Sequence, residues 1–315
     1  MSQRRLPRLA MTDATENPTI VVTGSTGLIG SQLVAAWQDS GRRAIRAVRR
    51  EVQDPGKELY WNPATGQIDR DRLEGVDAVV HLAGANIAGR RWSEGYKQQL
   101  LDSRVQGTTL LCQALADLEH KPRVLLCASA IGFYGDRGNE LLDETAAAGD
   151  GFLPELCLQW EQACRAAREA GIRVVNLRMG VVLSPQGGAL ASMLTPFKLA
   201  LGGVLGSGRQ YFSWISLDDV VPALLFVLED EALSGPVNLV APNPVTNREF
   251  TKALGRVLSR PTLLPMPAFA ARLAFGEMAD ALLLASTRVL PNRLTAAGFH
   301  FEYPQLEPAL RHLLG

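Results

Sequence analysis

The sequence lacks several features that would assign it to a common functional class. It has no excess charge of one sign, because 32 basic residues face 32 acidic residues among 315. A chain without a net positive field is poorly suited to bind a nucleic-acid backbone or an anionic membrane surface. No apolar run approaches the roughly 18 residues of a transmembrane helix. We therefore predict no nucleic-acid partner and no membrane partner, and expect a small-molecule substrate.

Cysteine is also scarce. The four cysteines show no C-x-x-C spacing, and each lies in an apolar or helical stretch. This pattern is typical of reduced, buried thiols in a cytoplasmic protein, and it predicts no metal site. The residues concerned are Cys112, Cys127, Cys157 and Cys164.

A glycine-rich turn is the first informative feature that is present. Residues 19–24 form a β-branched run, and residues 28–41 have the apolar spacing of a helix that ends at a glycine. The glycines between them allow a tight turn, close approach of a pyrophosphate and packing of helix on strand. We predict dinucleotide binding here, because an ordinary glycine-rich turn would not need this strand and helix around it. The residues of this turn are Gly24, Ser25, Thr26, Gly27, Leu28, Ile29 and Gly30.

The next predicted strand, residues 43–50, ends where dinucleotide-binding folds distinguish the two nicotinamide cofactors. An acidic residue there would favour NAD(H), but this sequence has Arg49 and Arg50. Guanidinium groups suit a 2′-phosphate through charge-assisted hydrogen bonds. We therefore expect NADP(H) rather than NAD(H), with the alternative that one or both arginines only solvate a loop.

Segments with strand and helix patterns alternate as far as residue 183. Such alternation predicts an α/β fold with a doubly wound parallel sheet, Rossmann-like, whose ligands lie beyond the carboxyl ends of the strands. Arg104 is a candidate for the cofactor phosphates or an anionic substrate. The other cofactor-binding residues predicted along this edge are Leu82, Ala83, Gly84, Ala128, Arg178, Gly180 and Val181.

Five motifs together resemble one superfamily. They are "VTGSTGLIG", "HLAG", "SAIGFYG", "LRMGVVLS" and "SWISLDDVV", and they resemble the extended short-chain dehydrogenase/reductases, a group with nucleotide-sugar epimerases and dehydratases. "HLAGANIAGRRW" and the C-terminal segment resemble its epimerase-like subfamily with a short C-terminal domain of unknown function. The resemblance covers residues 19–314. It implies a Rossmann domain that binds NADP(H), but it does not supply a substrate.

The superfamily's usual catalytic motif is missing. Its members normally pair a serine with Tyr-x-x-x-Lys, in which the lysine lowers the tyrosine pKa and holds the ribose. No tyrosine of this chain is followed by a lysine four residues later, and no lysine occurs between Lys121 and Lys198. If Glu161 matches the glutamate that often follows the motif, the resemblance puts Leu153 and Cys157 at the tyrosine and lysine positions.

Three residues are candidates for the remaining chemistry. Ser129 resembles the family serine and is expected to face the nicotinamide or a substrate oxygen. Tyr134 is an alternative acid, unless its ring packs in a turn under the cofactor. Glu161 is a second alternative if burial raises its pKa, unless it lies on the helix surface or pairs with an arginine. His81 is expected to be a packed strand residue rather than a catalytic one.

These features lead to two functional hypotheses. The first is an NADP(H)-dependent oxidoreductase or epimerase that acts on a small carbonyl or sugar-like substrate with an atypical proton donor. The second is a catalytically silent NADP(H)-binding redox sensor, which the missing motif favours. The retained serine and the glycine-rich loops of the second half favour the enzyme.

The chain is expected to have four parts. Residues 1–18 carry positive charge without a signal-peptide core, which predicts a flexible leader and makes Met11 a candidate start. Residues 19–183 form the dinucleotide-binding domain. Residues 184–265 form a substrate lobe and return to the main sheet, and Asp218 or Asp219 is expected to cap a helix there. The C-terminal helical domain, residues 266–315, is a candidate surface for a homodimer.

Overall fold

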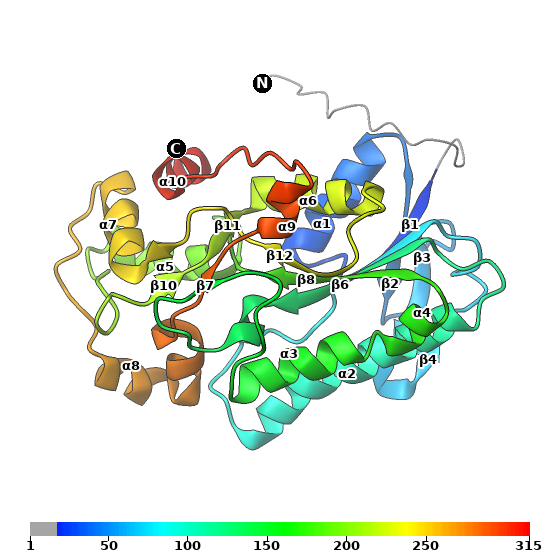
Figure 1. Cartoon of the computed structure of the whole chain (residues 1–315), viewed down its shortest axis with the longest axis horizontal. Coiled ribbons are helices and arrows are strands. Elements are labelled where there is room, and N and C mark those ends of the chain that lie inside the picture. The colour runs from blue at the N-terminus through cyan, green and yellow to red at the C-terminus, as the bar shows by residue number, and fades with distance from the viewer. Residues whose placement is uncertain (1–17) are drawn as a thin grey trace.

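The computed structural model describes residues 18–315, so the predicted leader lies outside the described residues apart from Pro18. Figure 1 shows an α/β architecture around an eight-stranded sheet with the order β12-β8-β6-β5-β1-β2-β3-β4. Every neighbouring pair of strands is parallel except β3 with β4, at one edge. The predicted doubly wound, mostly parallel sheet is confirmed.

The sheet strands are β1 (Thr19–Thr23), β2 (Arg43–Val48), β3 (Glu58–Asn62), β4 (Gln67–Ile68), β5 (Ala78–His81), β6 (Val124–Ala130), β8 (Arg173–Met179) and β12 (Gly235–Leu239). The helices of this part are α1 (Leu28–Asp39), α2 (Glu94–Ala116), α3 (Phe152–Gln162), α4 (Arg165–Glu169) and α6 (Leu217–Glu229). Short 3-10 turns are η1 (Pro63–Thr65) and η2 (Ile131–Tyr134).

Both faces of the sheet are covered, which explains the apolar runs in its central strands β1, β5 and β6. Side chains alternate along β1: Ile20 and Val22 pack with α1 and α6, whereas Val21 packs with α2 and α4 on the other face. Figure 1 shows these two helical layers above and below the sheet. The four cysteines are buried and free, as predicted.

The strand order reverses direction at β1, which lies between β5 and β2. Ligands of open parallel sheets bind at such a switch point, beyond the carboxyl ends of the strands. The register brings Thr23 beside His81 at the end of β1 and β5. It likewise brings Ser129 beside Arg178 in β6 and β8. The predicted site residues therefore share the edge of the sheet that is formed by the carboxyl ends of its strands.

The rest of the chain forms a smaller lobe beyond that edge. Its helices are α5 (Gly188–Lys198), α7 (Asn247–Val257), α8 (Ala268–Phe275) and α10 (Leu306–Leu314), with a π-helical turn η3 (Ala279–Leu284), whereas α9 (Asn292–Ala296) packs beside β12 of the main sheet. Its short strands pair as β9 (Val181–Leu183) with β11 (Trp214–Ser216), β10 (Tyr211–Phe212) with β13 (Val245–Thr246), and β7 (Leu141–Leu142) with β14 (Arg288–Val289). These pairs join segments distant in the sequence.

One predicted helix cap is wrong. Ser216 caps α6 by accepting a hydrogen bond from the Asp218 amide, so Asp218 and Asp219 lie in the first turn instead of at the cap. Their charges still favour the positive end of the helix dipole. Asp219 is buried and accepts amides of the C-terminal segment, which is a tertiary role that local sequence does not reveal.

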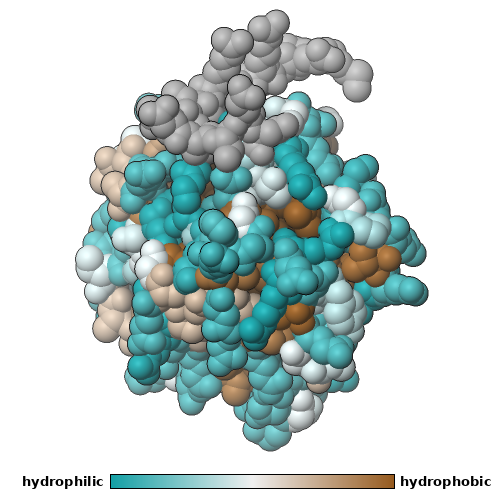
Figure 2. Space-filling model, turned by 90° about the vertical axis from the view of Figure 1, so that its right-hand side faces the viewer, coloured by the Kyte–Doolittle hydropathy of each residue, from teal (hydrophilic) through white to brown (hydrophobic). Residues whose placement is uncertain are grey.

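The surface is mixed in character. Figure 2 shows the end of the molecule that carries β3 and β4, where hydrophilic residues dominate and hydrophobic ones form separate small patches. Across residues 18–315, none of the helices combines the length and apolar character that crossing a membrane requires.

Candidate functional site

The glycine turn joins the end of β1 to the start of α1. Gly24 has a φ of +67°, and a Cβ there would lie 2.8 Å from the carbonyl carbon of Leu82. A Cβ on Gly30 would lie 2.3 Å from the Gly24 oxygen, so backbone packing excludes a side chain at both positions. A Cβ on Gly27 would have its nearest neighbour, the same oxygen, at 3.2 Å. Gly27 is thus the least enclosed of the three glycines, and it is the one that is exposed.

The start of α1 suits an anion. Gly27 is its N-cap, and no side chain of the described residues caps it. The first amides of a helix lack partners within the helix and carry partial positive charge, so they can bind a phosphate. Thr26 is exposed beside them, Leu28 and Ile29 are half-buried, and Ser25 is buried. The residues present fit a pyrophosphate.

A buried hydrogen-bond chain fixes this turn from below. Trp160 Nε1 donates to Thr108 Oγ1 at 3.0 Å, and Thr108 Oγ1 lies 3.0 Å from His81 Nε2. His81 Nδ1 lies 2.7 Å from Thr23 Oγ1, which also accepts the amides of the two residues after His81. Burial lowers the pKa of His81 to about 4, so the ring is neutral. The prediction of a packed strand histidine is confirmed.

The two arginines after β2 differ in their surroundings. Arg50 donates to both carboxylate oxygens of Glu58, at 3.0 and 2.7 Å, and Arg46 donates to one of them at 3.0 Å. The hydrogen bonds from Arg50, followed by that from the Gln53 amide, lower the pKa of Glu58 to about 2. Arg49 is exposed and has no ion pair within residues 18–315. Arg49 is the arginine of this pair whose side chain remains available for a phosphate.

Ser129 lies at the carboxyl end of β6 in a buried polar cluster. Its hydroxyl donates to Glu161 Oε1 at 2.7 Å. Arg178 donates to the same carboxylate through Nε to Oε1 at 2.9 Å and through Nη2 to Oε2 at 3.0 Å. Both carboxylate oxygens accept hydrogen bonds, so neither is arranged to donate a proton. This geometry matches the alternative in which Glu161 pairs with an arginine.

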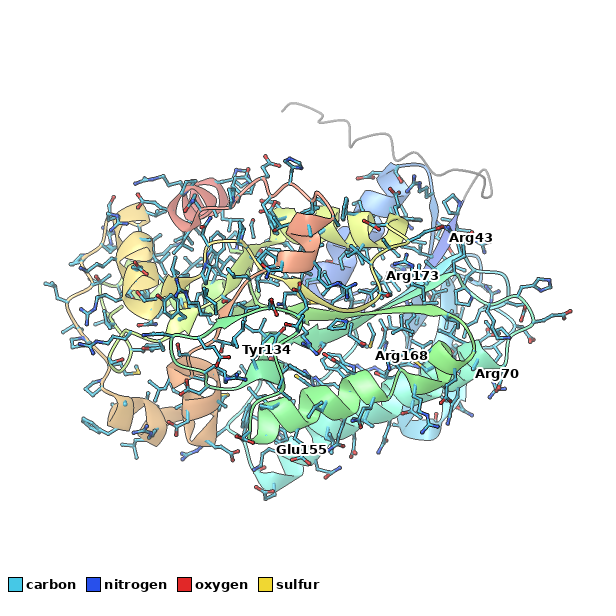
Figure 3. The ribbon with its side chains drawn as sticks, viewed as in Figure 1. Arg43, Arg70, Tyr134, Glu155, Arg168 and Arg173 are labelled. Atoms are coloured by element: carbon cyan, nitrogen blue, oxygen red, sulfur yellow. The ribbon has the colours of Figure 1, made fainter. Side chains whose placement is uncertain are left out.

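Tyr134 lies behind this cluster, in η2. Its ring is fully buried, and its hydroxyl donates to Asn238 Oδ1 at 2.7 Å and accepts from Arg178 Nη1 at 3.1 Å. Burial raises the pKa of Tyr134, and the Arg178 charge opposes part of that rise. Protein groups enclose the hydroxyl, so the geometry favours a packed turn over a proton donor. Figure 3 shows Tyr134 at the end of the sheet opposite Arg173.

Arg104 reaches this edge from α2. Its guanidinium donates to the backbone oxygens of Leu100 and Ala85. A Cβ added to Gly84 would lie 3.4 Å from the Cζ of Arg104. The guanidinium also stacks over Trp160, 5.0 Å from the ring centroid. Arg104 therefore lies directly beside the segment that follows β5.

Three other predicted cofactor residues have less distinctive surroundings. Ala128 is buried immediately before Ser129. The amide of Gly180 donates to Leu239 at 3.1 Å, and that of Val181 donates to the Ser213 oxygen at 3.0 Å. Because these amides have protein acceptors, their assignment to cofactor binding stays a prediction.

Two residues that hold predicted site residues in place were missed by sequence reasoning. Glu58 joins Arg46 to Arg50, and Asn238 holds the Tyr134 hydroxyl while its amide nitrogen donates to the Leu290 oxygen at 2.9 Å. Asn238 is the only side-chain amide in the apolar strand "PVNLVAP". A polar residue in a buried strand requires a hydrogen-bond partner, and that signal could have identified it.

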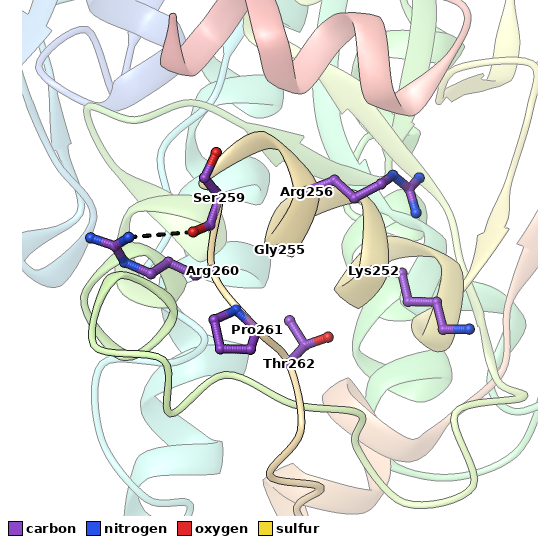
Figure 4. A pocket seen from close by; sticks show the side chains of 7 residues that line it. All are labelled: Lys252, Gly255, Arg256, Ser259, Arg260, Pro261 and Thr262. Atoms are coloured by element: carbon purple, nitrogen blue, oxygen red, sulfur yellow. Dashed lines mark hydrogen bonds between the residues drawn. The ribbon is translucent and has the colours of Figure 1, made fainter.

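A cavity of about 390 Å³ lies away from this edge, on α7 and the chain after it. Figure 4 shows its basic lining residues Lys252, Arg256 and Arg260. Arg256 lies in the last turn of α7, where a cation offsets the negative end of the helix dipole, and Arg260 follows the helix. Arg256 also pairs with Glu307. This lining has a structural explanation, so the sheet edge is the candidate site.

Comparison with known proteins identifies relatives along nearly the whole chain. Residues 20–240 match the NAD dependent epimerase/dehydratase family, and residues 266–313 match a domain of unknown function, DUF1731. An epimerase family protein of Mycobacterium bovis, Mb2239, is 50% identical over 294 residues, which is 93% of this chain and 97% of that protein.

Solved structures give the same picture. The human epimerase family protein SDR39U1, crystallised with NADPH, has a TM-score of 0.85 and 34% identity over 94% of this chain and 98% of its own. A nucleoside-diphosphate sugar epimerase from Corynebacterium glutamicum has a TM-score of 0.79 and 37% identity, covering 95% of this chain and 59% of that one. This chain belongs to the NAD dependent epimerase/dehydratase family, within the extended short-chain dehydrogenase/reductase fold, and it carries the DUF1731 domain at its C-terminus.

Proposed function

We propose that the protein binds NADP(H) and transfers a hydride between it and a small carbonyl or sugar-like substrate at Ser129. The observation that carries this proposal is the turn at the uncapped start of α1, where Gly24 and Gly30 are closely packed and Gly27 is exposed. The exposed Arg49 supports a preference for the 2′-phosphate. The NADPH found in the human relative agrees with this preference.

The nicotinamide would supply the hydride chemistry, and the chain would position the substrate. The hydroxyl proton of Ser129 is engaged by Glu161, which leaves the lone pairs of Oγ to accept a hydrogen bond. A substrate hydroxyl that donates to Oγ therefore fits this arrangement. Arg178 fixes Glu161 from the other side and so orients the serine through it.

A redox sensor without catalytic turnover is the second candidate. It is favoured by the enclosed hydroxyl of Tyr134 together with the missing lysine, since no ordinary proton donor then faces the substrate. Such a protein would bind NADP(H) with the same turn but would leave bound NADPH unoxidised.

A single-turnover experiment separates the two candidates. The purified protein is loaded with NADPH and mixed with a panel of aldehydes, ketones, quinones and keto-sugars, while absorbance reports cofactor oxidation. Stereospecific oxidation by any carbonyl that is lost in Ser129→Ala supports the enzyme. Tight NADPH binding without oxidation across the panel supports the sensor.

The cofactor preference has its own test. Arg49→Gln should weaken NADPH binding about 10- to 100-fold, the usual cost of losing a hydrogen bond between charged groups, and should leave NADH binding unchanged. The matched control is Arg43→Gln, which alters an exposed arginine at the opposite end of β2. An unchanged ratio of NADPH to NADH affinity in Arg49→Gln would exclude Arg49 as the phosphate-binding residue.

A further inference from the structure

Arg104 is a buried cation whose surroundings do not balance its charge. Only 9% of its surface is exposed, and it has no acidic partner within salt-bridge distance among residues 18–315. Burial lowers its pKa, which records the cost of desolvating the guanidinium. Arg178, buried nearby to a similar extent, has the carboxylate of Glu161. A buried charge without a partner is strongly unfavourable, so a ligand that supplies one would relieve the cost.

The donors of Arg104 are also incompletely used. A guanidinium has five N–H groups. One donates from Nη1 to the Leu100 oxygen at 3.2 Å, and one donates from Nη2 to the Ala85 oxygen at 3.1 Å. Nε is buried and has no hydrogen-bond partner among the described residues. The side chain therefore has donors left for a ligand with several oxygen acceptors.

The position of this guanidinium is fixed. It stacks over Trp160, and Trp160 is held by the hydrogen-bond chain that runs through Thr108 and His81 to the end of β1. On its other side lies Gly84, where a Cβ would come within 3.4 Å of Cζ. The same hydrogen-bond chain ends at Thr23, which accepts the amides of Leu82 and Ala83, the residues that pack against Gly24. Arg104 and the glycine turn are thus parts of one rigid edge.

Arg104 lies against α3 near Cys157, because its guanidinium stacks over Trp160, which follows Cys157 by three residues in the same helix. Burial raises the pKa of the Cys157 thiol to about 12, so this thiol is neutral and brings no charge. Cys157 is the residue that the family resemblance puts at the position of the motif lysine. The positive charge that the lysine would bring from α3 comes here from α2.

We infer that Arg104 takes the place of the absent lysine and binds the ribose and pyrophosphate oxygens on the nicotinamide side of the cofactor. This inference rests on the proposed function. It assigns the two arginines to opposite halves of the ligand: Arg49 to the adenosine 2′-phosphate and Arg104 to the half that carries the nicotinamide. It also explains how a buried guanidinium is retained without a carboxylate.

Binding measurements on the full chain test this division. NADPH and adenosine 2′,5′-bisphosphate are titrated by calorimetry into wild type, Arg104→Gln and Arg104→Lys. The bisphosphate lacks the pyrophosphate and the nicotinamide ribose. Arg104→Gln should bind NADPH about 10- to 100-fold more weakly and the bisphosphate normally, and Arg104→Lys should recover part of the loss. Arg49→Gln should weaken binding of both ligands.

Arg173→Gln is the matched control. Arg173 is a partly buried arginine at the opposite end of the sheet, where it donates to the backbone oxygens of Val227, Leu228 and Leu233. Its loss should lower the melting temperature and leave NADPH affinity unchanged. A folded Arg104→Gln that binds NADPH as wild type does, or an Arg104→Lys that binds NADPH no more tightly than Arg104→Gln, would overturn the inference. A wild type that binds no NADPH would instead overturn the proposed function beneath it.

Discussion

At the scale of single residues, two glycines of the turn predict different consequences of substitution. Gly30→Ala should destabilise the fold by about 1–3 kcal/mol, because its Cβ would overlap the backbone of Gly24 and the helix must shift. Gly27→Val should retain most stability but lose NADPH binding, because its side chain fills the space for the pyrophosphate. Urea unfolding and NADPH titration measure the two effects. A Gly27→Val protein with full NADPH affinity would show that the turn holds no phosphate.

The same residues indicate how far the sequence could be interpreted. The glycine spacing, the serine and the alternating apolar runs are local patterns, so the sheet and the cofactor turn could be predicted from them. The partners of Arg50 and Tyr134 could not, since Glu58 and Asn238 come from strands that meet them only in the folded sheet. The sequence therefore led to the same interpretation for both arginines, although Arg50 pairs with a carboxylate and Arg49 has no ion pair among the described residues.

At the scale of secondary-structure elements, His81 links β5 to β1 and α2 through its two threonine partners. Its pKa is lowered to about 4, whereas an unfolded histidine titrates near 6.5. Between pH 4 and pH 6.5, His81 therefore binds a proton in the unfolded chain but not in the folded chain. The contribution of neutral His81 to the free energy of unfolding is fully present above about pH 6.5. It is lost as the pH falls toward 4, and about 2 kcal/mol is lost at pH 5.

Urea unfolding of wild type and His81→Asn at about pH 7.5 and pH 5 measures this contribution. The variant should be less stable at neutral pH and should lose about 2 kcal/mol less on acidification. Comparison of variants is needed because burial raises the pKa values of Glu144 and Asp219, whose protonation acts in the opposite direction. His300→Asn changes an exposed histidine and serves as the control. Its loss of unfolding free energy between pH 7.5 and pH 5 should equal that of wild type. Equal pH slopes in wild type and His81→Asn would contradict the prediction.

At the scale of the whole molecule, one buried carboxylate is among the groups that attach the C-terminal segment to the main domain. Asp219, at the start of α6, accepts the Glu302 amide at 2.7 Å and the Tyr303 amide at 3.0 Å. α6 in turn packs with α1, the helix of the glycine turn, in one core. The chain after α9 is thereby connected to the cofactor side of the sheet, and α10 follows beside α7 (Figure 1). The boundaries of the parts and a homodimer stay predictions.

Asp219→Ala tests this attachment, because it removes the acceptor of two partly buried amides, at a total cost of about 1–3 kcal/mol. Hydrogen exchange should accelerate at residues 299–306, while the β1 and β5 amides keep their protection. Asp218→Ala is the matched control: Asp218 is more exposed and pairs with His312, so its loss should leave exchange at 299–306 nearly unchanged. Faster exchange throughout the sheet of Asp219→Ala would mean that the C-terminal segment and the main domain unfold as one unit. Unchanged exchange at 299–306 would mean that contacts other than Asp219 hold the segment in place.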